Sequence, residues 1–73
     1  MEKLINILER IKPGVDYSNT TNLASSGILD SLSIIELIEE IENEYSIEVS
    51  MDEFILENFE SAANIYNMIQ GLK

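Results

Sequence analysis

Residues 30–45, DSLSIIELIEEIENEY, are the stretch that decides the fold. Apolar side chains recur there at helical spacing and predict one amphipathic helix over residues 31–45. They are Ile34, Ile35, Leu37, Ile38, Ile41 and Tyr45. Either Asp30 or Ser31 can cap the start of this helix, and residues 33–36 (SIIE) also fit a capping box. The pattern alone does not choose among these caps.

Shorter patterns on both sides predict the other elements. Apolar residues at positions 4, 5, 8 and 11 indicate a helix over about 2–12, which Pro13-Gly14 ends. Residues 13–30 are rich in Ser, Thr and Asn and predict one long loop, a kind of segment that is often functional. Residues 50–53 (SMDE) open a short helix to about Leu56, and a last helix starts near Ser61. The predicted fold is all-α: a single domain over 1–73, built as a small bundle of three main helices and one short helix.

Composition excludes several classes of function. The 73 residues include no cysteine and no histidine, which removes disulfides, thiolate metal sites and the commonest general base. Fourteen acidic residues against four basic ones give a net charge of −10, which disfavours nucleic acid and anionic membranes. No apolar run approaches the ~20 residues of a membrane span, and no signal-peptide pattern is present. We expect a cytoplasmic monomer without membrane insertion, whose partners are proteins with a basic docking face.

Ser31 is the residue best placed for chemistry, because it lies where the long loop meets the predicted helix. Catalysis by a serine needs a base, and neither a histidine nor a nearby lysine exists, so an enzyme is not expected. A helix N-terminus does favour a phosphate ester, which makes Ser31 a candidate for modification by another protein. The alternative is that Asp30 and Ser31 only cap the helix.

The predicted helix carries a second candidate feature, a run of carboxylates without any interspersed lysine or arginine. The candidate docking residues are Glu36, Glu39, Glu40 and Glu42. Like charges at neighbouring helical positions destabilise a helix by about 0.2–0.5 kcal/mol per pair. The run is either an ordinary solvated face or a surface for a basic partner. Ligand spacing typical of a calcium loop is absent, so no dedicated metal site is predicted.

The residues around Ser31 resemble the acyl/peptidyl carrier protein family. The resemblance is carried by Gly27-Ile28-Leu29-Asp30-Ser31-Leu32, by IELI over 35–38, by IENEYSIEV over 41–49 and by ENFESAANI over 57–65. The first of these is closer to stand-alone aminoacyl or D-alanyl carriers than to typical fatty-acid carriers. Fatty-acid carriers often have an acid before the glycine and another after the leucine, and both are missing here.

The resemblance implies a function. Ser31 would receive 4′-phosphopantetheine from coenzyme A through a separate phosphopantetheinyl transferase, and the thiol of that arm would carry an acyl or aminoacyl group as a thioester. Asp30 would assist the transferase or place the arm, and Leu32 and Val49 would flank it. The partners would be an acyl- or aminoacyl-activating enzyme and a downstream synthase or transferase. The pathway stays open among fatty-acid, polyketide and nonribosomal peptide synthesis and D-alanylation. The competing hypothesis is an unmodified acidic interaction module, with Ser31 as a plain cap.

Overall fold

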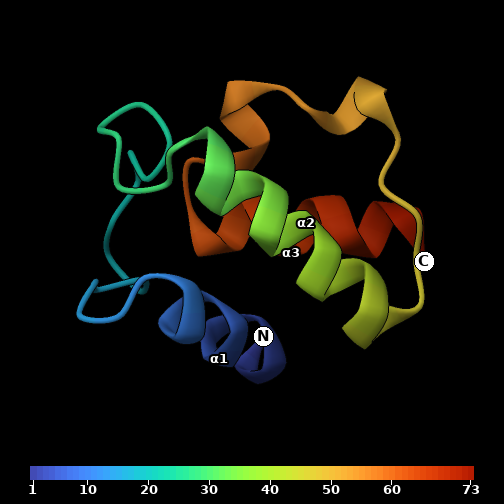
Figure 1. Ribbon diagram of the computed structural model, residues 1–73, viewed down its shortest axis with the longest axis horizontal. Helices are drawn as coiled ribbons and strands as arrows, with labels where there is room; N and C mark the ends of the chain where they lie inside the picture. The colour runs from blue at the N-terminus through green and yellow to red at the C-terminus, as the bar shows by residue number, and fades with distance from the viewer.

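Three helices form the body of the molecule in the computed structural model, which describes residues 1–73. They are α1 (Glu2–Ile11), α2 (Ser31–Tyr45) and α3 (Ala62–Leu72). Two 3-10 turns, η1 (Met51–Glu53) and η2 (Leu56–Phe59), lie between α2 and α3. In Figure 1, α2 crosses in front of α3, α1 lies below α2, and the 46–61 segment arches above. The prediction of a small all-α bundle is confirmed.

Packing of α1 against α2 and α3 buries the core. The N-terminus of α1 lies by the C-terminus of α2, since Lys3 Nζ is 5.8 Å from the Tyr45 ring centroid and Arg10 approaches Glu40 further along. The two helices are therefore antiparallel. Lys73 Nζ lies 5.5 Å from the same ring, so both ends of the chain meet the end of α2. The core is a single cluster of 15 buried hydrophobic residues.

Asp30 is the cap of α2, which decides the question that the pattern left open. Its backbone is extended (φ −81°, ψ 179°), and its Oδ1 accepts the Ser33 backbone N–H at 2.8 Å. Ser31 is thus the first residue inside the helix, and Ser33 is buried within it. The predicted capping box at 33–36 is not used. At the other end, Ser46 closes α2 in the left-handed region (φ 54°).

The segment between α2 and α3 differs from its prediction. One short helix was expected from Ser50 to about Leu56, but the Ser50 side chain makes no capping bond and the chain forms the two separate turns η1 and η2. The physical reason is burial: a short helix needs an apolar stripe against the core. The apolar side chains of this segment instead remain partly exposed outside the core; these are Met51, Phe54, Ile55 and Leu56.

The long loop before α2 is fixed to the core by Tyr17, Leu23 and Leu29, all buried. The Tyr17 hydroxyl shares its one proton between the carbonyls of Leu8, at 3.1 Å, and Lys12, so it stabilises the end of α1. Gly27 has φ +85°, a conformation in the left-handed region that only glycine adopts readily, three residues before Asp30. None of the helices combines the length and apolar character required to cross a bilayer.

Candidate functional site

Ser31 lies exposed at the first position of α2. Because Asp30 provides the cap, no hydrogen bond within the chain engages the Ser31 hydroxyl. The first backbone N–H groups of a helix lack intrahelical partners and mark its positive dipole end. A phosphate ester on Ser31 would therefore lie where a helix stabilises negative charge. The predicted position of Ser31, between loop and helix, is confirmed.

The carboxylate of Asp30, the residue before Ser31, is held in its charged form. The Ser33 backbone N–H, with a smaller contribution from the charge of Lys12, lowers the pKa of Asp30 below its ordinary value. Asp30 therefore places a fixed negative charge beside Ser31 at neutral pH.

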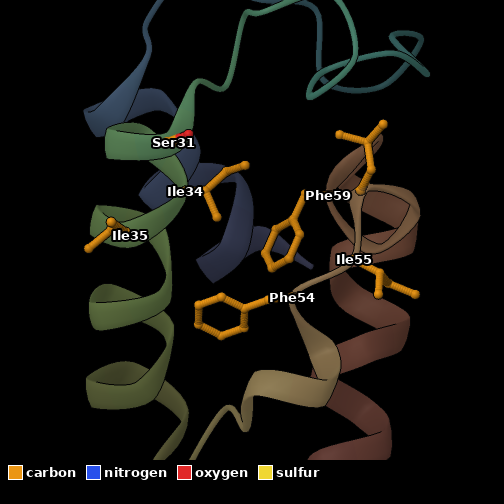
Figure 2. Close-up of a pocket in the computed structure, with 7 residues that line it drawn as sticks. Ser31, Ile34, Ile35, Phe54, Ile55 and Phe59 are labelled. Carbon is orange, nitrogen blue, oxygen red and sulfur yellow. The ribbon is translucent and has the colours of Figure 1, made fainter.

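An apolar cleft opens beside Ser31, between α2 and the η1–η2 segment. It has a volume of about 310 Å³, and its lining comprises Ser31, Ile34, Ile35, Phe54, Ile55, Leu56 and Phe59. Figure 2 shows Ile34 extending from α2 toward Phe59, with the rings of Phe54 and Phe59 on the opposite side. Six of the seven lining residues are hydrophobic, so this cleft suits an apolar group attached close to Ser31.

Leu32 and Val49, expected to flank an arm on Ser31, lie in different surroundings. Leu32 is 65% exposed next to Ser31, although it does not line the cleft. Val49 is buried and follows the far end of α2, where its backbone N–H donates to Glu42 Oε2 at 2.9 Å. Of these two residues, Leu32 is therefore the one exposed beside Ser31.

The four candidate docking carboxylates on α2 are not equivalent. Glu36 and Glu39 are exposed and form no ion pair. Glu40 Oε1 lies 3.7 Å from an Arg10 guanidinium nitrogen, and Glu42 is engaged by the Val49 N–H. Glu36 and Glu39 are therefore the carboxylates most available to a partner. Acidic side chains are not gathered into any group of three or more that could bind a metal ion.

Glu60 was not predicted as a site residue, yet its side chain contacts the loop that leads to Ser31. Its Oε1 accepts the backbone N–H groups of Ala24 at 3.0 Å and Ser25 at 2.9 Å. The Ser25 N–H, with that of Ala24, lowers the pKa of Glu60 below its ordinary value. These residues are 35 and 36 positions apart in sequence, so no local pattern could have indicated the contact.

Comparison with known proteins shows the family of this chain. The family model described as "Phosphopantetheine attachment site" matches residues 2–69. The chain belongs to this family. It is 35% identical over 72 residues to D-alanyl carrier protein 2 of Lactiplantibacillus plantarum, covering 96% of this chain and 89% of that protein. It is 34% identical over 73 residues to the D-alanyl carrier protein of Streptococcus uberis, covering 99% and 89%.

This carrier protein holds an acyl or aminoacyl group as a thioester on a 4′-phosphopantetheine arm. It interacts with a phosphopantetheinyl transferase and with enzymes that activate the group it carries. The exposed hydroxyl at the start of α2 and the apolar cleft beside it fit such an arm. When attached, the arm supplies the thiol that bears the cargo.

Acidification will weaken the cap of α2. Because the pKa of Asp30 is lowered in the folded protein, its stabilising effect is present at neutral pH and is lost as the pH falls through that lowered value. We expect Asp30→Ala to lower the free energy of unfolding at pH 7, and the difference from wild type to shrink below about pH 4. Urea unfolding of the wild type and of Asp30→Ala from pH 7 to below about pH 4 measures this difference in the free energy of unfolding. A difference that stays constant with pH would show that the charge of Asp30 does not contribute.

Proposed function

We propose that Ser31 is the residue that bears the phosphopantetheine arm. This proposal is carried by one observation at the start of α2. Asp30 caps the helix by accepting the Ser33 N–H, and the Ser31 hydroxyl is left free and exposed. The family assignment supplies the chemistry, since a carrier needs an accessible hydroxyl for the phosphodiester. Asp30 then acts beside the acceptor as a fixed charge, and Leu32 provides an exposed apolar contact for the arm or the transferase.

The carrier has no catalytic activity of its own in this proposal. It works as a single domain over 1–73 and as a monomer in the cytoplasm, where coenzyme A is available to the transferase. Support comes from the absence of histidine and cysteine in the sequence and from the single hydrophobic core.

The proposed docking surface for basic partners is the exposed face of α2 around Glu36 and Glu39, with Glu40 and Glu42 contributing less. Because rim charges act mainly on association and its salt dependence, we expect Glu36→Gln and Glu39→Gln each to raise the KM for phosphopantetheinyl transfer about 2–5-fold at low salt. Glu48→Gln, which removes an exposed charge beyond the end of α2, is the matched control. Equal KM values for all three variants would count against a localised docking surface.

The proposed cargo is an aminoacyl group, with D-alanine as the first candidate. Its support is the near full-length similarity to two D-alanyl carrier proteins. The cleft beside Ser31 favours a second candidate, an acyl group with a hydrocarbon chain, because six of its lining residues are hydrophobic.

Loading experiments distinguish the two cargoes. The phosphopantetheinylated protein is incubated with ATP and a D-alanine-activating enzyme, and in parallel with a fatty-acyl-activating enzyme and a medium-chain fatty acid. Intact mass before and after hydroxylamine treatment detects the thioester. We expect loading by D-alanine and little by L-alanine or the fatty acid. Efficient loading by the fatty acid alone would contradict an aminoacyl cargo and favour an acyl group with a hydrocarbon chain.

A further inference from the structure

Three consecutive backbone N–H groups in the loop before Ser31 donate to one distant residue, Glu60. Leu23 donates to the Glu60 main-chain carbonyl at 2.8 Å, while Ala24 and Ser25 donate to its Oε1 at 3.0 and 2.9 Å. The side chain forms no ion pair with a lysine or arginine. One oxygen of the Glu60 carboxylate, Oε1, thus serves as the acceptor for two N–H groups of this loop.

These bonds fix a compact turn that leads directly to the attachment residue. Within residues 22–29, the Ser26 N–H donates to the main-chain carbonyl of Asn22 at 2.9 Å. The Leu29 N–H donates to the main-chain carbonyl of Leu23 at 2.8 Å. Leu29 is buried and immediately precedes Asp30 and Ser31. Because the turn is internally bonded, fixing one side of it at Glu60 restrains the other side, where α2 begins.

Glu60 is itself held firmly by its neighbours in sequence. Phe59 is buried and lines the far wall of the cleft beside Ser31. Ser61 caps α3, with its Oγ accepting the Asn64 N–H at 3.0 Å. The carboxylate therefore connects the loop before Ser31 with the cleft wall at Phe59 and with the start of α3.

We propose that Glu60 is a positioning residue for the modification of Ser31, an inference that rests on the proposed function of that serine. By anchoring residues 23–25, Glu60 sets where the Ser31 hydroxyl lies relative to the docking face of α2. A partner that docks through Glu36 and Glu39 then finds the hydroxyl in one place. Loss of the anchor leaves docking intact and misplaces the acceptor.

The test compares Glu60→Ala, Glu60→Asp and Glu60→Gln with Glu57→Ala. Glu60→Asp keeps the charge but shortens the side chain by one methylene, and Glu60→Gln keeps an oxygen acceptor of the same reach. Glu57 is a nearby exposed carboxylate without a hydrogen bond from the chain. The readouts are kcat and KM for phosphopantetheinyl transfer, and hydrogen exchange of the Ala24 and Ser25 amides in the unmodified protein.

We expect Glu60→Ala and Glu60→Asp to lower kcat about 10- to 100-fold, since misplacement by 1 Å can have an effect of that size. KM stays near the wild-type value, and exchange at both amides accelerates. Glu60→Gln restores most of kcat, and Glu57→Ala changes nothing. If Glu60→Ala does not fold, Glu60→Asp carries the comparison.

Two results would overturn the positioning role. One is a wild-type kcat in folded Glu60→Ala or Glu60→Asp. The other is an equal loss in Glu60→Ala, Glu60→Gln and Glu57→Ala, the three variants that remove a charge, which would indicate a charge effect. If wild-type protein is not modified at Ser31, the proposed function falls and this inference with it. Amide exchange still reports the hydrogen bonds in that case, so the two failures are distinguishable.

Discussion

Replacing Ser31 by alanine will abolish phosphopantetheine loading and leave the fold unchanged. The loss is complete because the hydroxyl oxygen itself would form the phosphodiester. The fold is spared because Asp30, not Ser31, caps α2, and the Ser31 side chain is exposed without a hydrogen bond. We expect the free energy of unfolding to change by no more than about 0.5 kcal/mol. Intact mass after incubation with the transferase, and urea unfolding of the same sample, measure both effects.

Ser25→Ala is the matched control for this substitution. Ser25 is an exposed serine of the preceding loop, and its backbone N–H, which the substitution keeps, donates to Glu60. It should load like the wild type. Loading of Ser31→Ala, or its loss in Ser25→Ala with normal loading of Ser31→Ala, would contradict the assignment of the acceptor.

Leu37→Ala will strongly lower the stability of the protein. Leu37 is fully buried in the core, and truncation of such a side chain typically lowers stability by about 2–5 kcal/mol. A 73-residue domain has little reserve, since total stabilities start near 5 kcal/mol. We expect most of the cooperative unfolding transition to be lost at 37 °C. Thermal unfolding followed by circular dichroism measures it.

Leu32→Ala makes the same chemical change on the same helix at a site that is 65% exposed. Its effect on stability should stay within about 0.5 kcal/mol. The main effect of Leu32→Ala should instead be on the kinetics of phosphopantetheinyl transfer, since Leu32 lies beside Ser31. Equal destabilisation by the two substitutions would contradict the described burial of α2.

Helix α2 could be predicted from the sequence because its signals are local. The apolar spacing and the residues before position 31 define its bounds, and the structure places it at Ser31–Tyr45. Its cap could not be chosen, because Asp30, Ser31 and Ser33 all have capping side chains. The choice depends on the extended backbone at Asp30, which the spacing of residue types does not reveal.

The features that could not be predicted from the sequence depend on contacts between distant segments. Residues 50–56 fit a helix start, but their apolar side chains remain exposed outside the core, and two turns form instead. Ile35 was expected on the apolar face of α2, and its side chain is 51% exposed and lines the cleft. Glu42 and Glu60 look like surface carboxylates in the sequence, and only the fold brings backbone N–H groups to them.

The most direct measurement is the location of the phosphopantetheine on the wild-type chain. The folded protein is incubated with coenzyme A, Mg²⁺ and a broad-specificity phosphopantetheinyl transferase, then cleaved and fragmented by mass spectrometry. Serines also occur nearby at positions 25, 26 and 33, so the measurement distinguishes Ser31 from other possible acceptors. A single phosphopantetheine on Ser31 is the predicted result. Attachment to another serine, or no attachment to folded and previously unmodified protein, would contradict the account.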